Sequence, residues 1–129
     1  MPFDLKRKQF IMKNSIFIIV VFLICLGYIH GWKVKLCEHK NYKGRCGYLA
    51  GNDCRNIDEM KWCNGNSCKK NADKKVSSIK LYGSCIQLYK DRDCEGSSKK
   101  IRSGLWWWLR RRNLRRCDFN DKASSVGPC

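Results

Sequence analysis

Two stretches of the sequence repeat one another, "LCEHKNYKG" at Leu36–Gly44 and "LYKDRDCEG" at Leu88–Gly96. They superpose at a constant offset of 52 residues, so that each begins with a leucine and ends with a glycine. Self-similarity at a fixed offset is typical of a duplicated structural unit. A glycine at the end of a tight hairpin supplies the positive φ angle that other residues resist. We therefore expect two copies of one unit, each with an early hairpin that contains glycine.

The repeat extends beyond these hairpins. The pairs at the same offset are Leu36 and Leu88, Lys40 and Arg92, Gly44 and Gly96, Leu49 and Ile101, and Ile57 and Leu109. Further on, "DKKVSSI" from Asp73 resembles "NDKASSV" from Asn120 at an offset of 47 residues. This change predicts five extra residues in the first copy, within "KWCNGNSCKK", where Cys63 and Cys68 could close on each other. Two copies of about 45 residues form one domain, because neither could bury a core alone.

Each copy is rich in predicted strands. The segments "WKVKLC", "SSIKLYG" and "CIQLYKD" alternate apolar and polar residues, and turn residues recur at short spacing. This pattern is typical of a β-sandwich, and no stretch shows a long period of 3.6 residues. The sequence predicts an all-β fold.

These residues resemble the βγ-crystallin family. Its Greek-key unit has an early hairpin with an aromatic residue two positions before a glycine, as in Tyr42 and Gly44. The unit later carries a [ND]-[ND]-x-x-[ST]-S stretch, which "NDKASS" at 120–125 matches at every position. The resemblance implies a sandwich of two Greek-key motifs, at about residues 32–79 and 80–129. Two departures stand out: Cys94 replaces the expected aromatic residue, where we expect a disulfide to replace ring packing, and Lys74 replaces an acid or amide.

The resemblance also implies that these paired stretches bind calcium. The implied side-chain ligands are Asp73, Ser77, Asn120, Asp121 and Ser124, with backbone carbonyls from Lys75 and Lys122. Such ligands suit calcium, a hard cation that takes six to eight oxygens. Because ligands are shared between the copies, Lys74 is expected to degrade one of the two sites and leave one weak site. The alternative is that the serines of both stretches only satisfy backbone groups in the loops.

The first 31 residues predict a secretory signal peptide. Basic residues precede an apolar run of 14 residues, Ile16–Ile29, which is shorter than the roughly 20 residues of a spanning helix. We take Gly31 as the last residue before cleavage, with Gly27 as the alternative, and Met12 could be the true start. An uncleaved signal anchor is the competing interpretation. The remaining domain, residues 32–129, is expected to be secreted.

Nine cysteines remain after the predicted cleavage. They are Cys37, Cys46, Cys54, Cys63, Cys68, Cys85, Cys94, Cys117 and Cys129. In a small secreted chain this density predicts a disulfide framework. The absence of a CxxC pair and the single histidine of this part, His39, argue against zinc. Because nine is odd, four bridges leave one thiol free or paired with another chain, and the sequence does not identify it.

The domain is strongly basic, with 23 lysines and arginines against 10 acidic residues, a net charge of +13. This charge favours an anionic partner such as a membrane or an acidic glycan, and secretion argues against nucleic acid. The segment "LWWWLRRRNLRRC" at Leu105–Cys117 concentrates the candidates. They are Trp106, Trp107, Trp108, Arg110, Arg111, Arg112, Arg115 and Arg116.

Two interpretations of this segment stay open. The repeat places it inside the second copy, with Leu109 pointing inward opposite Ile57 and at least one tryptophan exposed. An exposed tryptophan among arginines suits a membrane interface. Core packing by two tryptophans beside a solvated arginine loop is the alternative. An amphipathic helix is disfavoured, because the apolar residues from Leu105 to Leu109 would surround it.

We expect a protein without catalytic activity, because no metal, phosphate-loop or nucleophile motif is present and His39 has no recognisable partner. Three functional classes remain. The first is a secreted calcium-binding domain, and the second is an antimicrobial or toxin-like protein that acts on anionic membranes. The third is a peptidase inhibitor that would present the loop between Cys63 and Cys68.

Overall fold

The computed structural model describes residues 2–28 and 31–129, and the chain divides into two units, residues 1–31 and residues 32–129. The described part of the first unit is one helix, α1 (Pro2–Tyr28). Ile29, the last residue of the predicted apolar run, lies outside the described residues. Within the described ranges, no helix has the length and hydropathy needed to cross a membrane.

The second unit is mostly β structure, as the sequence predicted. Its strands are β1 (Trp32–His39), β2 (Lys43–Gly51), β3 (Arg55–Asn56), β4 (Trp62–Asn64), β5 (Ser67–Lys69), β6 (Ser78–Tyr82), β7 (Cys85–Tyr89), β8 (Ser98–Arg102) and β9 (Ser125–Pro128). Its helices are η1 (Lys40–Tyr42), η2 (Ile57–Glu59), η3 (Arg92–Cys94), α2 (Leu105–Arg112) and η4 (Leu114–Cys117). The three segments predicted as strands from their alternation correspond to β1, β6 and β7.

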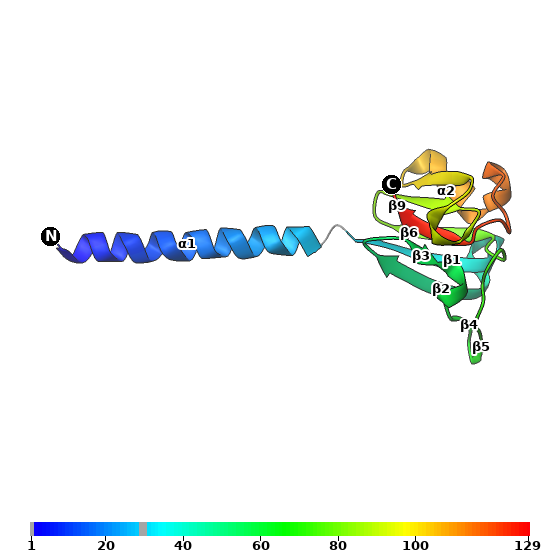
Figure 1. Ribbon diagram of the computed structural model, residues 1–129, viewed down its shortest axis with the longest axis horizontal. Coiled ribbons are helices and arrows are strands. Elements are labelled where there is room, and N and C mark those ends of the chain that lie inside the picture. The colour runs from blue at the N-terminus through cyan, green and yellow to red at the C-terminus, as the bar shows by residue number, and fades with distance from the viewer. Residues whose placement is uncertain (1, 29–30) are drawn as a thin grey trace. The chain divides into compact units, whose positions relative to one another are not determined.

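The strands form two antiparallel sheets (Figure 1). One has the order β5-β4-β2-β1-β6, and the other has the order β3-β9-β7-β8. Strand β3 comes from the first copy of the repeat but pairs with β9 of the second, so the two copies exchange backbone hydrogen bonds. This exchange joins both copies into one domain, as expected for units too small to bury separate cores.

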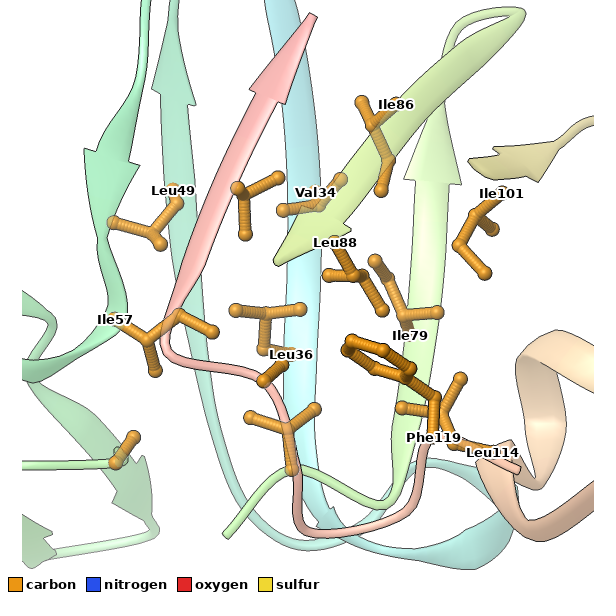
Figure 2. Close-up of a cluster of buried hydrophobic side chains, with 14 of the residues drawn as sticks. Val34, Leu36, Leu49, Ile57, Ile79, Ile86, Leu88, Ile101, Leu114 and Phe119 are labelled. Atoms are coloured by element: carbon orange, nitrogen blue, oxygen red, sulfur yellow. The ribbon is translucent and has the colours of Figure 1, made fainter. Parts of the chain in front are cut away.

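The core lies between the two sheets. It is formed by the apolar residues that alternate with polar ones in the strand sequences. Val34 and Leu36 of β1 are fully buried, as are Ile86 and Leu88 of β7. Figure 2 shows these side chains converging from different strands, with Leu114 near the end of the cluster. Side chains on one face of a strand recur every second residue, which explains how such short strands fill a common core.

The copies differ in length at two places, not at one as predicted. The amide of Ile57 donates to the Ser124 carbonyl, and the amide of Leu114 donates to the Ser77 carbonyl, both at 2.9 Å. The structural equivalent of Ile57 is therefore Leu114, which is buried, whereas Leu109 is 47% exposed. The second copy holds five extra residues before Leu114, and the first holds ten extra residues after Ile57.

Each insertion forms an element of its own. The five extra residues of the second copy fall where α2 forms, although the sequence disfavoured an amphipathic helix there. The ten extra residues of the first copy make the β4–β5 hairpin, which projects from the sheets in Figure 1. The predicted inward orientation of Leu109 was wrong because it assumed an unbroken offset of 52 residues.

Four disulfides staple this unit. They are Cys37–Cys46, Cys54–Cys94, Cys63–Cys68 and Cys85–Cys129. The closure of Cys63 on Cys68 and the bonding of Cys94 were predicted, and the odd cysteine is Cys117, a buried free thiol. All the disulfides and buried core residues that the structure describes lie within residues 32–129, so this unit contains the contacts required to fold alone.

Candidate functional site

The loops that carry the two serine stretches brace each other across the domain. The amide of Lys74 donates to the Ala123 carbonyl at 3.0 Å, and the amide of Asp121 donates to the Val76 carbonyl at 3.1 Å. Lys74 and Asp121 also share a left-handed backbone, with φ angles of 53° and 55°. These two residues are equivalent at the offset of 47, so the two contacts are related by the internal symmetry of the duplication.

One face of this arrangement gathers oxygen atoms from both copies. Ser77 Oγ donates to Asp121 Oδ1 at 3.3 Å, although the two residues are 44 positions apart. Asp121 Oδ2 accepts a hydrogen bond from Asn120 Nδ2 at 2.9 Å. Three of the residues implied as calcium ligands therefore lie together, and they come from different copies. We refer to Ser77, Asn120 and Asp121 as the oxygen cluster.

The symmetry-related position holds a lysine ammonium instead. Lys74 Nζ donates to the backbone carbonyl of Lys90 at 2.9 Å. Ser124, the equivalent of Ser77, is almost completely buried in the same region of the fold. The position that a carboxylate occupies in the oxygen cluster therefore holds a positive charge here. Lys74, which the sequence marked as a departure, thus supplies this half of the pseudo-symmetric pair with its own cation.

The offset of 52 residues also identifies a backbone oxygen that the sequence analysis missed. Lys90 corresponds to Glu38, so the internal symmetry makes the carbonyl of Glu38 the counterpart of the acceptor that Lys74 contacts. The equivalence is supported by the neighbouring contacts. The amide of Ser77 donates to the Cys37 carbonyl at 2.9 Å, and the amide of Ser124 donates to the Tyr89 carbonyl at 2.8 Å. Backbone acceptors leave no trace in a side-chain motif, although the repeat offset could have located this one.

Other groups of the remaining implied residues have partners outside the oxygen cluster. Lys75 donates its amide to the Ala72 carbonyl at 3.2 Å. Lys122 forms an ion pair with Asp118 at 3.1 Å. Asp73 accepts no hydrogen bond at its buried Oδ1, although its amide donates to Asn71 Oδ1 at 3.2 Å. This unpartnered carboxylate oxygen is a free acceptor within the loop of the first copy.

The donor set fits a hard cation better than a soft one. Hydroxyl, carboxylate and carbonyl oxygens are the ligands that calcium prefers. Within the described residues, no group of three or more His, Cys, Asp and Glu side chains could hold a metal ion. The hollow beside the cluster is also lined by Lys40 and Arg115, whose charges oppose a divalent cation. The oxygen cluster therefore has the donor chemistry that calcium prefers, in surroundings whose positive charge opposes a cation.

The last serine of each stretch has a structural role. Ser78 Oγ donates to the His39 carbonyl at 2.6 Å and accepts from the amide of Tyr42 at 3.1 Å. Ser125 Oγ donates to the Asp91 carbonyl at 2.6 Å and accepts from the amide of Cys94 at 2.9 Å. Each hydroxyl fastens the hairpin of its own copy. The structural alternative considered for the serines therefore holds for these two.

A second surface gathers the predicted tryptophan and arginine residues on α2 and η4. Trp107 packs against the core, whereas Trp106 and Trp108 are exposed. Arg110 lies over the Trp107 ring with 5.0 Å between the guanidinium carbon and the ring centroid, and Arg112 lies over Trp108 at 4.4 Å. Of the three tryptophans of α2, only Trp107 packs against the core, so the interpretation with two packed tryptophans was wrong.

Two further features border α2. Burial raises the pKa of Tyr42, and the positive charges of Arg111 and Arg112 offset part of this rise. Arg115 and Arg116 are exposed on η4, which follows the helix directly. The eight residues predicted to bind an anionic surface therefore lie on one continuous segment of the fold, although Trp107 is turned inward.

Comparisons with solved structures agree with this architecture, whereas the sequence matches no protein-family model and no curated protein. A βγ-crystallin from an archaeon matches with a TM-score of 0.54 and 16% identity over 76% of this chain and 98% of that one. A βγ-crystallin from Ciona intestinalis matches with a TM-score of 0.52 and 21% identity, over 75% and 99% of the two chains. A βγ-crystallin domain from Flavobacterium johnsoniae gives 0.51 and 24%, over 73% and 90%. With its two Greek keys, serine-fastened hairpins and these structural likenesses, the chain has the βγ-crystallin fold.

Proposed function

We propose that residues 32–129 form a secreted, non-catalytic domain that binds one calcium ion at the oxygen cluster. The observation that carries this proposal is the meeting of Ser77 Oγ and Asp121 Oδ1 across the two copies, at 3.3 Å. At the symmetry-related position, a lysine ammonium donates to a backbone carbonyl. The lysine ammonium fills one of two equivalent positions, and at the other position Ser77 and Asp121 offer oxygen ligands to a calcium ion.

The side chain of Asp121 and the hydroxyl of Ser77 would hold the ion, with backbone carbonyls completing its shell. Water molecules would supply the remaining ligands of a site that needs six to eight oxygens. The ion would tie the two copies together, because its ligands belong to both. A net charge of +13 and the nearby Lys40 and Arg115 weaken the attraction for a divalent cation. We expect a dissociation constant of about 10⁻⁴–10⁻³ M, the range of extracellular calcium modules.

Secretion and the absence of catalysis are parts of the same proposal. Four disulfides support an oxidising environment, since such bonds persist outside the cytosol. Helix α1, in which a basic start precedes an apolar half, supports a signal peptide at the N-terminus. The lone histidine of the domain, His39, is exposed at the end of β1, where its imidazole lies 3.7 Å from the Glu38 carboxylate. These features favour a binding protein over an enzyme.

Thermal unfolding of oxidised residues 32–129 tests the calcium site. We expect about 5 mM calcium to stabilise the domain by about 2 kcal/mol relative to chelator at matched ionic strength, for a dissociation constant of about 10⁻⁴ M. Asp121→Ala should abolish the calcium-dependent shift. Asp118→Ala is the matched control, because Asp118 also has a left-handed backbone, with a φ angle of 58° against 55° at Asp121. The control should keep the full shift.

A second pair of variants tests the role given to Lys74. Asp121→Lys gives the second copy the lysine that Lys74 provides in the first, and it should remove calcium binding without unfolding the domain. Lys74→Asp should raise the binding stoichiometry in calorimetry from one ion to two. Equal calcium responses in the wild-type, Asp121→Ala and Asp118→Ala proteins would refute the site, and so would the absence of any shift in the wild-type protein.

A further inference from the structure

Helix α2 presents apolar side chains to water. Leu105 is 86% exposed, Trp106 is 92% exposed and Leu109 is 47% exposed. At 100° per residue, these three positions fall within one arc of the helix, and Trp107 lies on the opposite side, against the core. An amphipathic helix of a globular domain normally buries its apolar arc. In α2 that arc faces outward, so something other than the core must be its partner.

The fold does not require this helix. Ile57 and Leu114 make equivalent hydrogen bonds at 2.9 Å in the two copies, and the first copy reaches Ile57 without any counterpart of α2. A helix inserted into a duplicated unit, with its apolar arc exposed, costs solubility and brings little core packing. Exposed apolar patches of this kind usually mark an interaction surface. The insertion is therefore best explained by what its outer face contacts.

Arginines flank the apolar arc on both sides. Arg110 and Arg112 lie on either side of Leu105 and Leu109 in the helical projection. The guanidinium of Arg110 covers the Trp107 ring on the core side, and that of Arg112 covers the Trp108 ring. Arg115 and Arg116 add two exposed charges on η4. The sequence from residue 96 to residue 117 contains eight basic residues and no acidic one. Among the described residues, no ion pair involves an arginine of α2 or η4. This positive charge is available to an anionic partner.

We propose that α2 docks the domain onto anionic lipid membranes, with Leu105, Trp106 and Leu109 inserted at the interface and the flanking arginines on lipid phosphates. Tryptophan is favoured at the boundary between headgroups and acyl chains, and basic residues are attracted to anionic leaflets. Exposed leucines distinguish this partner from an acidic glycan or a nucleic acid, because neither of these buries aliphatic side chains. A single helix of eight residues inserts little apolar area, so binding should be reversible and should require both contributions.

Vesicle partitioning of oxidised residues 32–129 tests the proposal, and the use of this unit avoids any contribution from α1. The vesicles contain phosphatidylcholine alone or with about one third phosphatidylglycerol. Trp32 and Trp62 are buried, so a blue shift in tryptophan emission on binding reports on α2. We expect partitioning into anionic vesicles that weakens with salt, little binding to neutral vesicles, and quenching by lipids brominated near the headgroup.

Two variants with a matched control separate insertion from charge. Trp106→Ser with Leu109→Ser should reduce partitioning at least 10-fold, because both side chains lie in the exposed arc. Arg110→Gln with Arg112→Gln should reduce it roughly 30-fold, at about 1 kcal/mol per basic residue. Lys33→Gln with Lys35→Gln removes the same charge from β1, where these lysines lie over tyrosine rings. This control should change partitioning only a few-fold.

Specific outcomes would overturn the proposal. Undiminished vesicle binding by the serine variant would show that α2 does not insert, and equal losses from the arginine and lysine variants would show attraction by net charge alone. If the wild-type domain prefers a single-stranded oligonucleotide or a heparin fragment and the serine variant binds vesicles normally, the partner is not lipid. Each variant is first checked for wild-type thermal unfolding. Leu105→Ser alone, at the 86% exposed position, replaces the double-serine variant if that one unfolds.

Discussion

Single hydroxyl groups hold the hairpins of this domain in place. Ser125 is completely buried, and its hydroxyl joins the carbonyl of Asp91 to the amide of Cys94. Ser125→Ala would leave both backbone groups without this partner, which costs roughly 1–3 kcal/mol. We expect the free energy of unfolding, measured with the disulfides intact, to fall by about 2 kcal/mol. Ser78→Ala should cost a similar amount in the other copy, and the exposed Ser84→Ala should cost almost nothing. Similar values for Ser125→Ala and Ser84→Ala would contradict the fastening role.

The free thiol of Cys117 provides a test of burial. Burial raises the pKa of this thiol, and the positive charges of Lys99 and Arg110 offset part of the rise. The thiol also contacts the Leu114 carbonyl at 3.4 Å. Because only the thiolate reacts, we expect the pH midpoint for alkylation of the folded protein to lie above that of the unfolded chain. The raised pKa stabilises the fold below the unfolded pKa of about 8.5, and this contribution is lost as the pH rises.

Iodoacetamide kinetics between about pH 7 and pH 10, in buffer and in denaturant, measure both midpoints. In residues 32–129, which exclude the exposed free Cys25, Cys117→Ala should remove the reaction of the folded protein and so identify the thiol. A folded-state midpoint at or below the unfolded one would show that the positive charges outweigh burial. The sequence predicted one odd cysteine, but only the packing of η4 identifies it, because eight other cysteines were equally eligible.

The family resemblance named the residues of the oxygen cluster but not the contacts that surround them. Ser77 and Asp121 were candidates from their motif positions, and the structure brings them together from different copies. Lys74 was marked as a departure, but its bond to the Lys90 carbonyl depends on how the loop of one copy lies against the hairpin of the other. Contacts of this kind are long-range, so a local motif could not predict them.

At the scale of elements, strands were predictable and α2 was not. The alternation in β1 and β7 survives because both strands bury one face against the same core. In α2 the apolar residues follow one another without a gap, so no helical stripe is visible in the sequence. The helix forms because leucine and arginine favour helical backbone and because Gly104 accepts the first turn's hydrogen bond from Trp108 at 3.2 Å. The sequence therefore did not show that the helix exposes one apolar arc and buries only Trp107.

The β4–β5 hairpin illustrates the opposite case. Cys63 and Cys68 flank a short turn with glycine and asparagine, and this spacing alone predicted their bridge. The hairpin is exposed from Asn64 to Asn71, so few long-range contacts compete with its local preferences. The sequence predicted five extra residues here, whereas the first copy holds ten. The five extra residues of the second copy, at α2, reduced the change in the repeat offset by half. Two compensating insertions cannot be separated by aligning the ends of a repeat.

At the scale of the whole molecule, the two copies are held together by strand exchange and by one covalent bond. Cys54 follows β2 in the first copy, and Cys94 ends η3 in the second, so their disulfide is the bridge that joins the hairpin of one copy to the body of the other. Cys94, at one end of this disulfide, is the equivalent of Tyr42 in the first copy. The aromatic ring that the fold would use there is replaced by a cross-link, as expected from the sequence. A domain of 98 residues has a small core, which makes such a cross-link important for stability.

The effect of this bridge on stability can be separated from the effect of removing cysteines. Cys54→Ser with Cys94→Ser opens a loop with a sequence separation of 40, whereas Cys63→Ser with Cys68→Ser opens one of 5. Because a disulfide stabilises the fold mainly by restricting the unfolded chain, the logarithmic dependence on loop length predicts a difference of about 2 kcal/mol between the two variants. Urea unfolding of both variants and of the wild-type domain would measure it, without calcium so that the oxygen cluster does not contribute. If both variants lost the same free energy, the link between the copies would be redundant with the β3–β9 pairing, and the strand exchange alone would hold the duplicated halves together.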